Sequence, residues 1–143
     1  MDMATMVASW SKDPSTQIGA VIVSPERRIL ATGYNGFPRG IEDDNRLHIR
    51  DQKYQLIVHA EMNAILNAAK HGVQLKGSIL FVKGLMVCAD CAKHVVQTGI
   101  AEINVEGDIY NPRWAAMTER SLALFDEADI PVYLKTGNQW NVT

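Results

Sequence analysis

Short apolar runs bounded by turn residues recur along the chain and predict strands. The expected strands cover residues 18–23, 29–32, 78–83, 102–105 and 131–134. A turn at 25–28, which contains proline, joins the first two strands as a hairpin. The later strands are separated by segments with helical spacing, an order that predicts a parallel portion of sheet with helices on both faces.

Helical spacing of apolar residues predicts four helices: one at the N-terminus, one over 59–70, one opened by Cys88 and one from 111 to about 127. Gly72 and Gly99 are expected to end the second and third helices. The expected buried faces are Met3, Met6, Val7 and Trp10, then Met62, Ile65, Leu66 and Ala69, then Val95 and Val96, then Trp114, Met117, Leu124 and Phe125. We therefore predict an α/β fold: a three-layer α/β/α sandwich with a mixed, about five-stranded sheet.

Two stretches lack either pattern. Residues 33–40 contain three glycines and a proline, which predicts an irregular loop whose backbone can approach a ligand closely. A glycine-rich loop taken alone is more often a plain surface loop. Residues 43–55 are polar and are expected to be irregular, with one helical turn.

Composition limits the possible partners. The 143 residues suit one domain spanning 1–143, and the net charge of −2 argues against a protein built to grip long nucleic acid. No apolar run of transmembrane length and no signal-peptide pattern is present, so no membrane partner is expected. The two cysteines form one C-x-x-C pair, which favours a reducing, cytoplasmic environment.

The residues with candidate chemistry are His59 and Glu61, two positions apart, and Cys88 and Cys91, three apart. A catalytic zinc commonly takes three protein ligands and keeps a fourth position for water. His59, Cys88 and Cys91 would supply the ligands, and Glu61 would move protons. This matches the H-x-E and P-C-x-x-C signature of zinc nucleobase deaminases, except that Val87 stands where the signature has proline.

A C-x-x-C pair alone can also be a redox pair or half of a structural zinc site. A structural site would need a fourth ligand, for which His94 is the candidate. The His59 and Glu61 pair favours the catalytic interpretation. We interpret His94, His71 and His48 as surface or local polar residues.

Several stretches together resemble the deoxycytidylate (dCMP) deaminases of the cytidine deaminase superfamily. They are residues 11–20, 33–40, 59–65, 88–93 and 97–100. The resemblance covers most of the chain, from Ser11 to about Val105. It implies a cytidine deaminase-like fold and zinc-dependent hydrolysis of dCMP to dUMP and ammonia, feeding thymidine nucleotide synthesis in the cytoplasm of a cell or of a phage-infected host.

The resemblance also implies roles for individual residues. His59, Cys88 and Cys91 would hold zinc, and Glu61 would be the catalytic proton shuttle. Asn35 would hold the sugar and the Ala60 backbone would meet the base, with Ser11 and Lys12 also assigned to substrate. The candidates for the substrate phosphate are Ser11, Lys12, Arg39, Arg46, Arg50 and Arg113.

Family members are often homohexamers that dCTP activates and dTTP inhibits. The resemblance therefore predicts a homo-oligomer with a regulatory nucleotide, accompanied by Mg²⁺. The residues assigned to that regulatory site are Gly33, Tyr34, Gly36, Arg39 and Asp44. Without a spare cysteine, a second zinc site is not expected.

Two other functions are compatible with parts of the sequence. One is a deaminase of another cytidine or adenine substrate, such as cytidine or a tRNA adenine. The negative net charge of the chain argues against tRNA as a substrate. The other is a non-catalytic nucleotide-binding zinc module. Glu61 argues against that module, because a protein without chemistry does not need the carboxylate.

Overall fold

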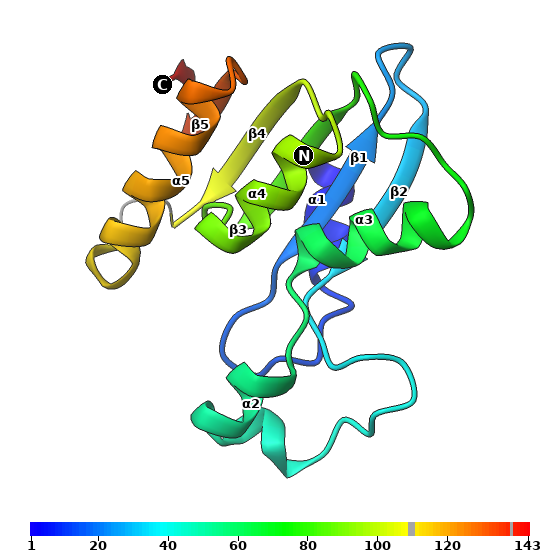
Figure 1. Ribbon diagram of the computed structural model, residues 1–143. Coiled ribbons are helices and arrows are strands. Elements are labelled where there is room, and N and C mark those ends of the chain that lie inside the picture. The colour runs from blue at the N-terminus through cyan, green and yellow to red at the C-terminus, as the bar shows by residue number, and fades with distance from the viewer. Residues whose placement is uncertain (109–110, 138) are drawn as a thin grey trace.

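The computed structural model describes residues 1–108, 111–137 and 139–143, and within them the strands form one mixed six-stranded sheet (Figure 1). The strands are β1 (Gly19–Val23), β2 (Ile29–Tyr34), β3 (Ile79–Gly84), β4 (Glu102–Gly107), β5 (Val132–Thr136) and β6 (Gln139–Val142), in the order β2-β1-β3-β4-β5-β6. β3, β4 and β5 pair in parallel, whereas β1 is antiparallel to both of its neighbours and β6 is antiparallel to β5. The predicted mixed sheet is confirmed. The prediction missed the sixth strand, which is only four residues long and whose residues are all exposed, so it lacks the apolar run used to predict the other strands.

Helices cover both faces of the sheet, which confirms the predicted layers. The helices are α1 (Asp2–Ala8), α2 (Arg50–Leu56), α3 (Ala60–Lys70), α4 (Ala89–Gln97) and α5 (Ala115–Glu127), with 3₁₀ turns η1 (Asn45–His48) and η2 (Pro112–Trp114). In Figure 1, α3, α4 and α5 lie on the near face and α1 on the far face. Among the described helices, none combines the length and apolar character needed to cross a bilayer.

The main core lies between the sheet and the helices α3, α4 and α5. Four of its side chains have no exposed surface: Ile22, Leu80, Ile103 and Phe125. Burying an aliphatic or aromatic side chain of this size contributes about 1.5–3 kcal/mol. The prediction that Phe125 belongs to the core is confirmed, and this core fixes α3 and α4 relative to the strands that precede them.

The predicted buried faces of the first two helices were partly wrong. Met3, Met6 and Trp10 are exposed, and the buried residues of α1 are Ala4, Val7 and Ala8. Likewise Leu66 and Ala69 are exposed, whereas Ala64 and Ala68 are buried. In both helices small residues face the sheet, because the helix backbone approaches a glycine of the strand closely.

The other departures concern the polar segment and the glycine loop. Residues 43–55 contain η1 and most of α2, so they are more helical than expected. Asp44 caps η1 through its side chain. Gly33 and Tyr34 belong to β2 rather than to a loop, and Gly36 pairs with Val58 in an isolated bridge.

Gly33 is where the backbone of α3 meets the sheet. A Cβ built on Gly33 would overlap the carbonyl oxygen of Ala60 and the backbone nitrogen of Ala64. Both are backbone atoms of the helix, which cannot rotate away as a side chain can. Gly33 therefore sets how closely the first turn of α3 approaches the sheet.

We expect Gly33→Ala to lower the free energy of unfolding by about 3 kcal/mol, at the upper end of the usual cost of overpacking. Urea denaturation measures this change. Gly36→Ala is the matched control, because its Cβ would meet only ring carbons of Tyr34, at 3.7 and 3.9 Å. Equal losses of stability in the two variants would show that the contact with α3 is not the reason for glycine at position 33.

Candidate metal centre and active site

Two helix N-termini meet beyond the carboxyl ends of β2 and β3. His59 is the N-cap residue of α3, and Cys88 is the N-cap residue of α4. Both residues have extended backbone, with ψ of 155° and 159°, so each side chain lies at the start of its helix. Cys91 follows one turn into α4. The helices expected over 59–70 and from Cys88 thus begin close to each other.

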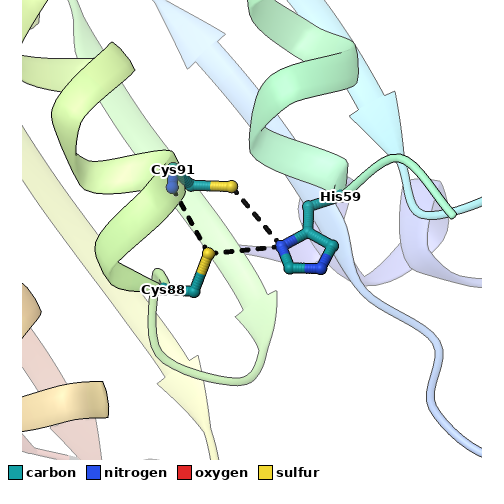
Figure 2. A group of neighbouring side chains, drawn as sticks. All are labelled: His59, Cys88 and Cys91. Carbon is teal, nitrogen blue, oxygen red and sulfur yellow. Dashed lines mark hydrogen bonds between the residues drawn. The ribbon is translucent and has the colours of Figure 1, made fainter. Parts of the chain in front are cut away.

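His59, Cys88 and Cys91 form a compact cluster of ligand atoms (Figure 2). The His59 Nδ1 atom lies 3.3 Å from Cys88 Sγ and 3.5 Å from Cys91 Sγ, and the three ligand atoms all lie within 4.8 Å of one another. Tetrahedral zinc with ordinary Zn–S and Zn–N bonds separates nitrogen from sulfur by about 3.6 Å. One imidazole and two cysteines at these distances fit a zinc ion.

The electrostatics of the cysteine pair also suit a metal. Hydrogen bonds from Cys91 and His59 lower the pKa of Cys88 to about 4, despite its burial. The hydrogen bond to Cys88 raises the pKa of His59 to about 8. Conversely, the bond with Cys88 and burial raise the pKa of Cys91. Zinc binds thiolates and a neutral imidazole, so binding the metal would release the protons of Cys91 and of His59.

Glu61 is buried beside this cluster, and one oxygen of its carboxylate has no partner within the described residues. Its side chain is 3% exposed, and within the described residues its Oε2 atom has no hydrogen-bond partner. Burial raises the pKa of Glu61 to about 7, although the neighbouring His59 opposes that rise. A buried polar atom without a partner is costly, and at a functional site it points to a ligand or substrate that supplies one.

A cavity of about 250 Å³ contains His59, Glu61 and Cys88 in its wall. The other residues that line it are Asp13, Thr16, Ile18, Asn35, Lys53, Tyr54, Ile57, Leu85, Met86, Asp90, Trp114 and Met117. Of the residues assigned to substrate from the sequence, Asn35 lines this cavity. The sequence did not predict Lys53, Tyr54 or Trp114 as residues of the site. For Lys53 and Tyr54 the sequence offered one indication, because they are neighbours in a polar segment rich in charge.

The carboxamide of Asn35 is oriented by three hydrogen bonds. Its Oδ1 atom accepts from the backbone N–H of Ile18 at 2.8 Å, and its Nδ2 atom donates to Thr16 O at 2.8 Å and to Asp13 Oδ2 at 3.4 Å. Both Nδ2 hydrogens are therefore used. An amide oxygen can accept twice, so Asn35 has one acceptor position left within the described structure.

Ser11, Lys12 and Ala60 lie outside the lining of this cavity. The Ser11 hydroxyl is buried and donates to the backbone carbonyl of Asn35 at 2.7 Å. Ser11 therefore holds the backbone of a residue that lines the cavity. The Lys12 ammonium forms an exposed ion pair with Asp43 at 2.9 Å. Ala60 is fully buried as the first residue of α3. Their predicted contacts with substrate stay predictions.

The five residues assigned to regulation make local contacts, and none lines the cavity at His59. Gly33 lies in β2 against the backbone of α3, and Gly36 forms a bridge with Val58. Tyr34 packs edge-on against Trp10, with ring centroids 6.3 Å apart. Arg39 donates to Asn67 at 2.7 Å, and Asp44 accepts from Arg46 at 2.8 Å.

The remaining histidines stay apart from the metal cluster. His94 Nδ1 lies 2.7 Å from the carbonyl oxygen of Asp90, and His71 is the C-cap residue of α3. Among the residues that the structure describes, no fourth ligand of the histidine, cysteine or carboxylate type joins the cluster. An open fourth position is the mark of a catalytic zinc site rather than a structural one.

A second cavity, of about 690 Å³, adjoins the first. The two share Thr16, Lys53, Tyr54, Leu85 and Trp114 in their walls. The second cavity is also lined by His48, Arg50 and Arg113. The Arg50 guanidinium lies 5.3 Å from the ring of Tyr54, and that of Arg113 lies 4.8 Å from the ring of Trp114. Cationic side chains thus gather beside the metal cavity.

Comparison with known proteins agrees with this geometry. The profile of the cytidine and deoxycytidylate deaminase zinc-binding region matches residues 1–106, which is most of the chain and includes every residue of the metal cluster. The chain belongs to this deaminase family. The predicted resemblance is confirmed, and the chain is a zinc-binding deaminase, a hydrolase.

Individual members of the family are similar over nearly the whole chain. A deoxycytidylate deaminase from Pongo abelii is 40% identical over 139 residues, which cover 91% of this chain and 74% of that protein. A deaminase encoded in the luxG 3′ region of Aliivibrio fischeri is 39% identical over 132 residues, covering 91% and 86%. The crystal structure of a dCMP deaminase from cyanophage S-TIM5, in complex with dCMP and dUMP, superposes with a TM-score of 0.78 at 25% identity and covers 94% and 92% of the two chains.

Proposed function

We propose that this deaminase converts dCMP to dUMP and ammonia by zinc-dependent hydrolysis. The observation that carries the proposal is the cluster of His59, Cys88 and Cys91, two of which share a cavity wall with Glu61, whose Oε2 atom has no partner within the described residues. The names of the relatives support dCMP as the substrate.

His59, Cys88 and Cys91 would hold the metal. When bound by such ligands, zinc lowers the pKa of a bound water to about 7 and so supplies a nucleophile at neutral pH. Glu61 lies in the same wall, where its carboxylate can accept one proton of the attacking water and pass it to the ring nitrogen N3. It can then take the proton of the new hydroxyl on C4 and deliver it to the amine, which leaves as ammonia when the C4–N bond breaks. Burial keeps bulk water from competing for that carboxylate.

The two adjoining cavities suggest how a nucleotide lies in the site. The base would enter the metal cavity, at the N-terminus of α3 where Ala60 begins the helix. Asn35, with one acceptor position left, is suited to a hydroxyl group of the sugar. The phosphate would then reach the second cavity, where Arg50 and Arg113 offer guanidinium groups that bind phosphate bidentately.

We expect kcat/KM for dCMP to exceed that for deoxycytidine by about 100-fold or more, since charge-assisted contacts contribute about 1.5–3 kcal/mol each. Purified protein is assayed with dCMP, CMP, deoxycytidine and cytidine by ammonia release and the ultraviolet change. Arg50→Ala and Arg113→Ala should narrow that ratio, whereas Arg28→Ala, distant from both cavities, should not. Equal turnover of nucleoside and nucleotide would contradict the proposed recognition of phosphate, and activity on CMP or cytidine alone would identify another cytidine substrate.

Regulation and assembly are proposed from the family resemblance. We infer that dCTP, with Mg²⁺, activates the enzyme and that dTTP inhibits it, in a homohexamer of single-domain chains. The same assay with either nucleotide tests regulation, and sedimentation equilibrium measures the assembly. A place in thymidine nucleotide synthesis follows from the product dUMP, and a cytoplasmic location from the reduced C-x-x-C pair.

A further inference from the structure

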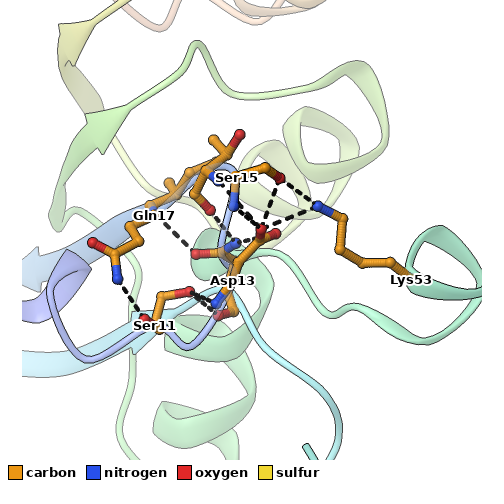
Figure 3. Close-up of polar contacts among 8 residues, drawn as sticks. Ser11, Asp13, Ser15, Gln17 and Lys53 are labelled. Atoms are coloured by element: carbon orange, nitrogen blue, oxygen red, sulfur yellow. Dashed lines mark hydrogen bonds and ion pairs between the residues drawn. The ribbon is translucent and has the colours of Figure 1, made fainter. Parts of the chain in front are cut away.

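Lys53 is a buried cation at the boundary between the two cavities. It lies in α2 and is 7% exposed. Its Nζ atom donates to Asp13 Oδ1 at 3.0 Å and to Ser15 Oγ at 2.6 Å (Figure 3). A buried lysine is kept charged only where partners of this kind compensate for its lost hydration. This ion pair joins segments that are 40 residues apart in the chain.

Asp13 also accepts hydrogen bonds from the turn that follows it in the chain. Its Oδ1 atom also accepts from Ser15 N at 2.9 Å, from Ser15 Oγ at 2.8 Å and from Thr16 N at 3.2 Å. Burial raises the pKa of Asp13, but the hydrogen bonds from Ser15 and Lys53 outweigh it and leave the pKa below its usual range. Asp13 is therefore a carboxylate that fixes the turn 13–16.

The same turn holds the side chain of Asn35. The Asn35 Nδ2 atom donates to Thr16 O and to Asp13 Oδ2, so the two acceptors that orient the carboxamide belong to the turn that Lys53 anchors. A continuous series of hydrogen bonds thus leads from the ammonium through Asp13 to the carboxamide in the cavity wall. Displacing the turn would move both acceptors together.

We propose that Lys53 is a positioning residue that orients Asn35 for the substrate sugar through Asp13 and the turn 13–16. The proposal rests on the proposed function, in which Asn35 contacts the sugar. Lys53 and Tyr54 are the residues of α2 that line the metal cavity, and the Lys53 ammonium joins α2 to the turn 13–16 in the same part of the structure. Lys53 thereby couples the segment between β2 and α3 to substrate binding.

Lys53→Met tests this role. We expect KM for dCMP and Kd for dUMP to rise about tenfold, the effect of losing one hydrogen bond to substrate, while kcat changes less than about twofold. A purely structural loss would instead lower the amount of folded enzyme without changing KM. Thermal unfolding and zinc content report the folded fraction. Ser15→Ala, a milder change that removes a hydroxyl bonded to both Asp13 and Lys53, should raise KM in the same direction by about threefold.

A double-mutant cycle separates positioning from direct contact with the phosphate. In an Asn35→Ala background, Lys53→Met should change Kd for dUMP by less than about twofold, because the residue through which Lys53 acts is gone. A full tenfold change in that background would show direct contact and overturn the proposal. Lys135→Met is the matched control, since Lys135 also forms a partly buried ion pair, 3.0 Å from Glu106, and should leave KM unchanged.

The outcomes also distinguish this proposal from the proposed function. If the wild-type enzyme turns over dCMP and both Lys53→Met and Ser15→Ala have the same KM as the wild type, the positioning role alone is overturned. A zinc-loaded wild type that does not deaminate dCMP overturns the proposed function and the positioning role with it.

Discussion

Glu61→Gln is expected to lower kcat for dCMP by about 1,000-fold while the protein keeps its zinc. General acid–base catalysis by a placed side chain contributes about 10² to 10⁴-fold. Glutamine keeps the shape of the buried side chain but cannot accept and return a proton. Steady-state kinetics measures the loss, and metal analysis of the same sample measures zinc.

Retention of zinc is the critical part of that result. His59, Cys88 and Cys91 form the cluster that can hold the metal, and within the described residues the Oε2 atom of Glu61 has no partner. Glu119→Gln is the matched control, because Glu119 is an exposed carboxylate on α5 and its replacement should leave kcat unchanged. If Glu61→Gln lost its zinc, Glu61 would be a ligand and the assignment of the proton shuttle would be wrong.

Cys91→Ala is expected to lower the affinity for zinc by more than about 100-fold, beyond the usual effect of losing an outer-shell partner of a ligand. Activity should fall in proportion to the zinc that remains bound. Equilibrium dialysis against a chelator measures the affinity. Far-ultraviolet circular dichroism should change little, because the core around Leu80 and Phe125 consists of apolar side chains packed between the sheet and the helices.

His94→Ala is the control for the ligand set. His94 lies one turn beyond Cys91, but its imidazole contacts the carbonyl of Asp90 rather than the cluster. Zinc affinity and activity should therefore be unchanged. A Cys91→Ala variant that retained zinc, or a His94→Ala variant that lost it, would show that the metal takes a different set of ligands.

The metal cluster could be predicted from the sequence because its spacing is local. His59 and Glu61 lie in one helical turn, and Cys88 and Cys91 lie in another. Each pair is placed by the start of its helix. Only the meeting of the two turns required the fold, because β2 and β3 must lie in the same direction for both helices to begin at one edge of the sheet.

The buried faces of helices were harder to predict, because apolar character does not decide close packing by itself. Ala4 and Ala64 are buried where larger Met3 and Leu66 are exposed. A large side chain cannot enter where the helix backbone comes close to the sheet, as it does at Gly33. The exposed methionines and leucine are therefore explained by backbone distance, which periodicity does not report.

The sequence by itself determined the candidate metal cluster, the place of Glu61 beside it and the alternation of strands and helices, since these depend on neighbours within a few residues. The tertiary structure alone decided what surrounds them. Lys53 and Asp13 meet across 40 residues, and Asn35 is oriented by a turn from another part of the chain. Such contacts depend on how segments pack, because a charge is buried only where the fold brings a partner to it. His59 and Glu61 indicate which reaction the protein performs; the wall that holds the substrate is a product of the fold.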